Sequence, residues 1–113
     1  MSTFEANNAS DGTILRGQIW AAENPKAVMS LVHGFGEHSG RYADMASYLN
    51  SKDISVVTLD LRGHGKSDGR RGYCPDYNLL LSDVDALLAK SREIYPDLPP
   101  ICFTVIPWAA ELL

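Results

Sequence analysis

The sequence has little cysteine, no long hydrophobic run and no excess of basic residues. Its two cysteines, Cys74 and Cys102, lie far apart without paired spacing, so neither a disulfide framework nor a zinc site is predicted, and both are expected to be free thiols. No stretch approaches the roughly 20 apolar residues that cross a bilayer. The first residues are polar and include Glu5 and Asp11, unlike the apolar core of a signal peptide. We therefore expect a soluble, cytoplasmic protein.

The charge balance argues against two classes of partner. The net charge is -4 and the isoelectric point is about 5.2. Neutralising nucleic-acid or lipid phosphates requires clustered lysine and arginine, and the largest basic cluster, Arg70–Arg71, is too small. The histidines lack metal-ligand spacing, so we expect no metal site and no cofactor.

The composition is that of a folded domain, with 45% apolar and 21% charged residues. No repeat or linker divides the chain, so residues 1–113 are expected to form one domain or part of one. Turn residues at 9–12 separate two strand-like runs and predict an antiparallel hairpin. The apolar patterns predict strands at 3–6, 13–21, 27–32, 54–59 and 100–106, helices at 41–50 and 77–95, and a long loop at 61–76.

The order of these elements defines the expected fold class. Strand, helix, strand, loop, helix, strand is the order of an α/β protein with a parallel sheet and crossover helices. Both glycine-rich segments then follow strand ends, at the edge where open α/β sheets bind ligands.

Two motifs follow these strands. The first, at 33–42, reads HGFGEHSGRY, and the second, at 60–67, reads DLRGHGKS. In this order the two segments closely resemble the monoacylglycerol lipases and serine aminopeptidase S33-type enzymes of the α/β-hydrolase superfamily. The resemblance covers residues 11–100, and it implies the N-terminal part of an α/β-hydrolase sheet.

The first motif has the chemistry of an oxyanion hole. A backbone N–H held against the charge that develops on an ester carbonyl lowers the barrier by about 3 to 4 kcal/mol. The resemblance implies that this donor is the N–H of Phe35, the residue after His-Gly. Gly34 and Gly36 would shape the loop by letting the backbone turn tightly beside a ligand. A plain glycine turn between strand and helix is the structural alternative.

The remaining polar residues of the motifs have simpler interpretations. The resemblance places the catalytic base late in the chain, so His33 is expected to pack and hydrogen-bond within its turn. Asp60 with Arg62 is expected to brace the second loop. A phosphate-binding loop is rejected because Asp60 stands where its first glycine should be. A dinucleotide fingerprint at 34–39 is only approximate, since Ser39 replaces the third glycine.

The resemblance ends near Pro100. The family continues with an apolar strand and a GHSMGG nucleophile elbow, whereas no GxSxG sequence occurs in these 113 residues. The serine of the triad is thus missing, and its aspartate and histidine would lie beyond Leu113. We expect an inactive hydrolase fragment whose intact relatives cleave monoacylglycerol or lysophospholipid esters.

The genetic code offers an explanation for the break. Reading each codon of residues 104–110 from its third base is compatible with Gly-His-Ser-Met-Gly-Gly, where the family has it. The in-frame residues fix two bases of each shifted codon, so chance agreement over six positions is improbable. We interpret 101–113 as an out-of-frame tail that follows a frameshift near Ile101.

Two alternatives stay open, and one physical consequence follows. The chain could belong to an active lipase with a frameshifted record, or it could be a small nucleotide-binding α/β module. If it is a fragment, the strand after Pro99 becomes an exposed edge that invites self-association. A poorly soluble or partly molten chain without a cooperative thermal transition is then expected.

Overall fold

A computed structural model describes residues 2–33, 42–71 and 77–104. The elements are β1 (Ser2–Asn7), β2 (Ile14–Trp20), β3 (Ala27–Val32), α1 (Ala43–Ser51), β4 (Ile54–Leu59), α2 (Tyr77–Ile94) and β5 (Pro100–Thr104). Five strands form one sheet in the order β1-β2-β4-β3-β5. The expected α/β class, with an N-terminal hairpin and then parallel strands, is confirmed.

Pairing in the sheet changes direction once. β1, β2 and β4 pair antiparallel, while β3 pairs parallel with both β4 and β5. The chain therefore leaves β3, forms β4 on one side of it, and returns to form β5 on the other side. This places β3 at the centre of three parallel strands.

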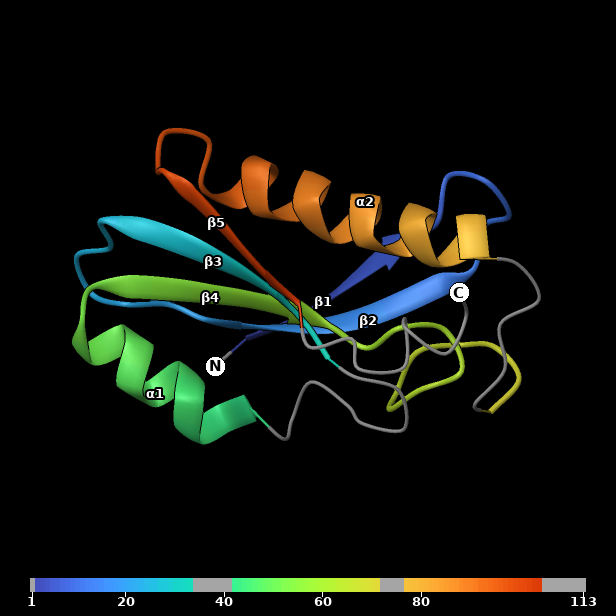
Figure 1. Ribbon diagram of the computed structural model, residues 1–113, viewed down its shortest axis with the longest axis horizontal. Coiled ribbons are helices and arrows are strands. Elements are labelled where there is room, and N and C mark those ends of the chain that lie inside the picture. Colours follow the sequence, from blue (N-terminus) through green and yellow to red (C-terminus); the bar gives the residue numbers. More distant parts are fainter. Residues whose placement is uncertain (1, 34–41, 72–76, 105–113) are drawn as a thin grey trace.

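The two helices cover opposite faces of the sheet (Figure 1). β3 and β4 are apolar along almost their whole length because side chains on both of their faces are buried. Under α2 the core contains Leu15, Val28, Val32, Val57, Leu59, Leu61, Leu80 and Leu87. Under α1 it contains Leu31, Ala46 and Val56. Each fully buried leucine or valine contributes about 1.5 to 3 kcal/mol.

One buried polar contact fixes α2 to the central strand. The hydroxyl oxygens of Ser30 and Ser91 lie 2.7 Å apart in a hydrogen bond. Both serines are nearly inaccessible to solvent. Because the hydroxyls pair with each other, two polar groups are buried there with a hydrogen-bond partner.

The element boundaries differ from the sequence-based expectations only at some ends. The strands at 27–32 and 54–59 are confirmed at both ends. α1 begins two residues later than expected and ends one later, and α2 ends one residue earlier. β5 runs as far as Thr104, and the last two residues expected for it lie outside the described part of the chain. No helix in the described ranges has the length and hydropathy needed to span a membrane.

Candidate active site

The carboxyl ends of the three parallel strands meet at one edge. Val32 is in register with Leu59 of β4 and with Thr104 of β5, so the three strands end at the same level. His33 follows β3 directly, and Asp60 follows β4. The first residue of each motif therefore lies at the edge where open α/β sheets bind ligands.

His33 joins the two motifs. Its ring is buried, with 1% of its surface exposed, and its Nε2 atom accepts a hydrogen bond from the backbone N–H of Leu61 at 2.9 Å. The ring of His64 packs against it with the centroids 5.1 Å apart. This partner belongs to the loop after the neighbouring strand, while the turn in which His33 was expected to bond, residues 34–41, lies outside the described residues.

Backbone hydrogen bonds shape the second motif. The carboxylate of Asp60 accepts the N–H of Lys66 at 3.0 Å, and the hydroxyl of Ser67 donates to the carbonyl of Asp60. The same hydroxyl accepts the N–H of Arg16 at 2.8 Å. Gly65 has a positive φ of 48°, and a Cβ atom there would lie 2.3 Å from the Asp60 carboxylate. This position therefore requires glycine.

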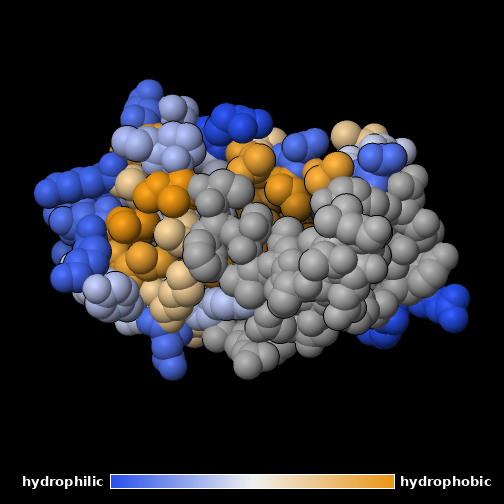
Figure 2. Space-filling model, viewed as in Figure 1, coloured by the Kyte–Doolittle hydropathy of each residue, from blue (hydrophilic) through white to orange (hydrophobic). Residues whose placement is uncertain are grey.

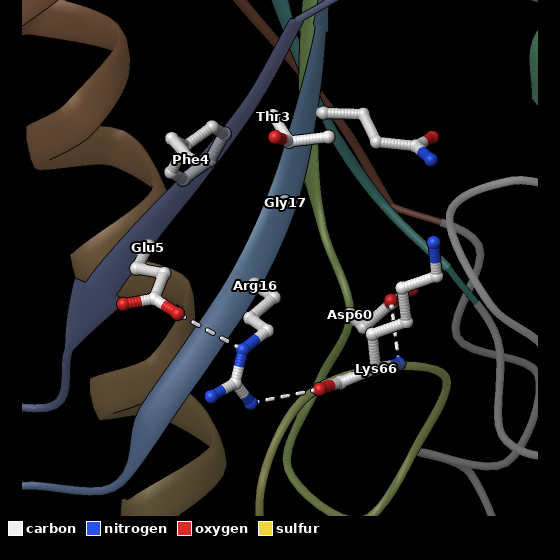
Figure 3. Close-up of a pocket in the computed structure, with 8 residues that line it drawn as sticks. Thr3, Phe4, Glu5, Arg16, Gly17, Asp60 and Lys66 are labelled. Atoms are coloured by element: carbon white, nitrogen blue, oxygen red, sulfur yellow. Dashed lines mark hydrogen bonds and ion pairs between the residues drawn. The ribbon is translucent and has the colours of Figure 1, made fainter.

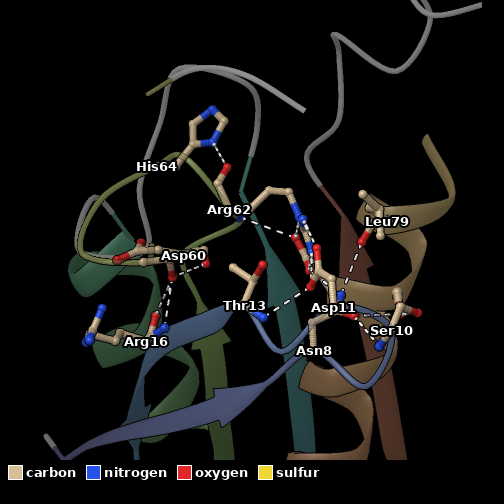
Figure 4. A network of polar contacts seen from close by, with 12 residues as sticks. Asn8, Ser10, Asp11, Thr13, Arg16, Asp60, Arg62, His64 and Leu79 are labelled. Carbon is tan, nitrogen blue, oxygen red and sulfur yellow. Dashed lines mark hydrogen bonds and ion pairs between the residues drawn. The ribbon is translucent and has the colours of Figure 1, made fainter. Parts of the chain in front are cut away.

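Arg62, expected with Asp60 to brace the second loop, holds it through partners that lie outside that loop. Its guanidinium donates to Asp83 of α2 at 2.8 and 2.9 Å and to Asp11 of the β1–β2 turn at 2.7 Å (Figure 4). The side chain of Asn8 donates to Asp83 at 2.6 Å. We call Asn8, Asp11, Arg62 and Asp83 the clamp. It ties the loop after β4 to the hairpin and to the helix.

The clamp shifts the pKa values of two of its residues, Arg62 and Asp11. The hydrogen bonds that Arg62 donates to Asp83, and then those that it donates to Asp11, hold the pKa of Arg62 above its ordinary value although burial opposes this. The Arg62 hydrogen bond, helped by the Thr13 N–H, holds the pKa of Asp11 well below its ordinary value. Since Asp83 is fully buried, its pairing with Arg62 is what permits a carboxylate at that position.

A shallow groove of about 340 Å³ lies over β1, β2 and the start of the loop after β4 (Figure 3). Arg16 in its wall binds Glu5 at 3.1 Å and Asp68 at 2.7 Å. The Asp68 hydrogen bond is the main reason why the pKa of Arg16 is raised. Glu5 and Asp68 therefore compensate the Arg16 charge, so Arg16 does not offer the groove an unpaired positive charge.

The chemistry available at the edge is that of binding and positioning. Gly34, Phe35 and Gly36, the expected oxyanion segment, lie outside the described residues. Ser67 is buried, and its hydroxyl is engaged by two backbone groups, so its environment is not that of an activated nucleophile. Within the described ranges, no three metal-binding side chains group together.

Asp83 is the polar residue that sequence reasoning missed. It shares the buried face of α2 with Leu80 and Leu87, at spacings of three and four residues. A carboxylate on an otherwise apolar helix stripe was the available signal, because such a charge needs a buried partner. The partner, Arg62, is 21 residues away and could not be chosen from spacing.

Sheet order and the residues at its carboxyl edge define an α/β-hydrolase, and comparisons with known proteins agree. Residues 23–104 match the family described as serine aminopeptidase, S33. The chain is 37% identical over 91 residues to human monoglyceride lipase, covering 80% of the chain and 30% of the relative. It is 34% identical over 84 residues to a monoacylglycerol lipase from Mycolicibacterium smegmatis, covering 74% of the chain and 30% of the relative.

Solved structures show the same fold. A thermostable carboxyl esterase from Bacillus coagulans superposes with a TM-score of 0.77 and 30% identity, covering 91% of this chain and 36% of the esterase. A monoglyceride lipase variant from Saccharomyces cerevisiae also has a TM-score of 0.77, at 20% identity, covering 92% of this chain and 35% of the lipase.

The chain belongs to the serine aminopeptidase S33 family of α/β-hydrolases, which confirms the resemblance seen in its motifs. It spans about a third of the length of the relatives it matches.

Proposed function

We propose that this chain supplies the N-terminal sheet and the first oxyanion donor of a serine hydrolase that cleaves carboxylic esters of the monoacylglycerol type. The supporting observation is the position of His33, the first residue of the HGFG sequence, which directly follows the central parallel strand at the carboxyl edge of the sheet. The ester class is carried over from the monoglyceride and monoacylglycerol lipases that the chain resembles.

The proposed mechanism is acyl transfer. A serine attacks the ester carbonyl while a histidine, oriented by an aspartate, takes its proton and passes it to the departing alcohol. Water then attacks the acyl-serine with the same histidine as base, which releases the carboxylic acid and restores the serine. The N–H of Phe35 and a second N–H, after the serine, would receive the charge on the carbonyl oxygen. These 113 residues contain no GxSxG sequence, so we propose that they are inactive without a nucleophile from elsewhere.

The register of β5 supports a frameshift as the reason why the GxSxG sequence is absent. Thr104, the last residue of β5, pairs with Val32, the residue before His33. That is where a nucleophile elbow would face the oxyanion segment. It is also where reading in the shifted frame yields Gly-His-Ser-Met-Gly-Gly. We therefore propose that residues 101–113 replace an elbow that a frameshift removed from the coding sequence.

The nucleotide sequence tests the frameshift directly. Shifting the frame after Ile101 should produce an aromatic residue, GHSMGG and a long open frame with the missing aspartate and histidine. Unrelated codons or an immediate stop would overturn the frameshift. The result needs no folded protein.

Chemical labelling tests the function. The 113-residue chain should hydrolyse p-nitrophenyl esters or monoacylglycerol at background rates, and a fluorophosphonate probe should label none of its serines. The frame-restored protein should be labelled at the serine of GHSMGG and should hydrolyse monoacylglycerol. Labelling of Ser39 or Ser67 in the 113-residue chain would show a different nucleophile. A frame-restored protein that is not labelled would overturn the proposed function.

A further inference from the structure

The tripeptide Ser-Asp-Gly occurs twice in the chain, at 10–12 in the β1–β2 turn and at 67–69 in the loop after β4. An aspartate followed by glycine can rearrange without an enzyme. The glycine nitrogen attacks the neutral side-chain carboxyl, whose hydroxyl leaves as water with the amide hydrogen, and a five-membered succinimide forms. Water then opens this ring at either carbonyl and gives aspartate or isoaspartate. Because the two tripeptides are identical, a difference in their reactivity reflects their surroundings.

Asp11 and Gly12 are held in positions that oppose this reaction. Both carboxylate oxygens of Asp11 accept hydrogen bonds, Oδ2 from Arg62 at 2.7 Å and Oδ1 from the N–H of Thr13 at 3.1 Å. The N–H of Gly12 donates to the carbonyl of Asn8 at 2.8 Å. The Arg62 hydrogen bond also holds the pKa of Asp11 well below its ordinary value, which disfavours the neutral carboxyl. Ring closure at this site must therefore break several bonds.

Asp68 and Gly69 have fewer restraints. Within the described ranges only Oδ1 of Asp68 has a hydrogen-bond partner, the guanidinium of Arg16 at 2.7 Å. The Asp68 side chain is 52% exposed and that of Arg16 is 34% exposed, so water competes for this ion pair. No acceptor in the described part of the chain binds the N–H of Gly69. The glycine nitrogen and one carboxylate oxygen are therefore available for ring closure.

The structure of the loop favours glycine at position 69. The φ angle of Gly69 is 117°, and a Cβ atom there would lie 2.9 Å from the backbone nitrogen of Gly63. Any other residue at this position would be strained and would crowd the loop. The residue type that makes ring closure easiest is thus the one that the fold requires beside Asp68.

We propose that Asp68–Gly69 is a site of spontaneous isomerisation to isoaspartate, and that the clamp and the β1–β2 turn suppress the same reaction at Asp11–Gly12. Isomerisation adds one carbon to the main chain. It also converts the α-carbonyl of Asp68, which accepts the N–H of Gly63 at 3.0 Å, into a side-chain carboxylate. The modification therefore loosens the end of the loop after β4 and leaves the clamp in place. This inference does not depend on esterase activity.

Peptide mapping of the 113-residue chain in water enriched in a heavy oxygen isotope measures both sites at once. Each succinimide that hydrolyses takes up one labelled oxygen, and the isoaspartate peptide separates from its aspartate counterpart by chromatography. In the folded chain at neutral pH, Asp68 should react about tenfold faster than Asp11 or more, the factor expected where one hydrogen bond to a charged group must break. In urea the two sites should react at similar rates, because the contacts that distinguish them are lost.

Two results would contradict the proposal. One is a folded chain in which Asp11 reacts as fast as Asp68. The other is a folded chain in which both sites are slowed by the same factor relative to urea. A chain that is partly molten falls under the first result, since neither site is then protected.

Two substitutions test the chemistry and its suppression. Asp68→Glu keeps the carboxylate but requires a six-membered ring, which closes far more slowly, so label should disappear from the peptide containing 67–69. Persistent label there would show a different reaction. Arg62→Gln removes a restraint on Asp11 and should accelerate its labelling about tenfold without changing the rate at Asp68. An unchanged rate at Asp11 would show that the clamp does not protect it.

The amide of Val57, inside β4, reports whether Arg62→Gln retains the fold. If the fold is lost, the comparison of the parent chain with and without urea decides, because it needs no substitution. In the purified isoaspartate form, the Gly63 amide should exchange about tenfold faster than in the unmodified chain, since its acceptor has left the main chain. Unchanged exchange at Gly63 would overturn the proposed loosening of the loop.

Discussion

The loop after β4 and strand β5 lie at the same sheet but are held in different ways. The loop is anchored by the clamp, by the hydroxyl of Ser67 and by Arg71, which donates to the carbonyls of Gly65 and Ser67. β5 pairs with β3 on one side, and in the described part of the chain no strand pairs with its other side. On the face seen in Figure 2, apolar side chains reach the surface over the region where β3 and β5 lie.

The two regions differ in how far their polar groups have hydrogen-bond partners within the described chain. Three buried polar residues of the loop, Asp60, Arg62 and Ser67, have hydrogen-bond partners within the described chain. β5 leaves backbone donors and acceptors along its outer edge, and Ile101 beside them is 38% exposed. We therefore expect the loop to resist perturbation until its charges are removed, and β5 to be the less protected region from the start.

Removing the buried carboxylate of the clamp should have the largest effect. Asp83→Ala leaves Arg62 buried with only Asp11 as a described ionic partner, and breaking a buried pair costs about 3 to 5 kcal/mol. Hydrogen exchange of the amides at 60–69 should accelerate by a corresponding factor. Asp85→Ala on the exposed side of α2 is the control and should change stability by less than about 0.5 kcal/mol. Equal effects of the two changes would show that the clamp is not the anchor.

The next largest effect is expected at Gly65. Gly65→Ala forces a side chain into the left-handed region, at about 1 to 2 kcal/mol, and places its Cβ against the Asp60 carboxylate. Gly12→Ala is the matched control, since φ is 74° and no atom lies within 4 Å of the added Cβ. Unfolding monitored by urea or by exchange should show a larger loss for Gly65→Ala. A smaller loss there than at Gly12 would contradict the structure of the loop.

Acid should loosen the clamp by a smaller amount. The pKa of Asp11 is lowered in the folded chain, chiefly by Arg62, so the ionised form stabilises the fold above the ordinary value of 3.8. That contribution is lost as the pH falls below about 4. The protection factor of the Thr13 amide, whose N–H Asp11 accepts at 3.1 Å, should fall over this range. Asp11→Asn should remove the pH dependence, while Asp97→Asn, at an exposed site, should leave it unchanged.

The smallest effect on stability is expected at β5, where solubility should respond instead. Ile101→Lys should change the free energy of unfolding by no more than about 0.5 kcal/mol but reduce ANS binding and aggregation, because a charge blocks edge pairing. Leu81→Lys, at an exposed leucine of α2, is the control and should change neither. Equal reduction by both would show that general surface charge, and not the β5 edge, controls association.

Much of the fold could be predicted because its signals are local. The apolar runs at 27–32 and 54–59 match β3 and β4 at both ends, since each strand is buried on both faces and needs uninterrupted apolar residues. The stripe containing Leu80 and Leu87 predicted α2, because a helix of 3.6 residues per turn brings such positions to one face. The two motifs indicated the family for the same reason, as each is a continuous stretch of chain.

The candidate site was predicted only in part. His33 was correctly placed at the end of a strand, but its partner Leu61 is 28 residues away. The pairing of Arg62 with Asp11 and Asp83 joins residues 51 and 21 positions apart, and no spacing rule selects these over Asp60, two residues away. The oxyanion role of Phe35 remains a prediction.

The sequence by itself determined which segments are strands and helices and which family the chain resembles, because periodicity and motifs act over a few neighbouring residues. The tertiary structure alone decided which charges pair and which backbone N–H the ring of His33 accepts. Those outcomes depend on which donors and acceptors meet in the interior, where a polar group without a partner is costly and the surrounding packing determines the partner.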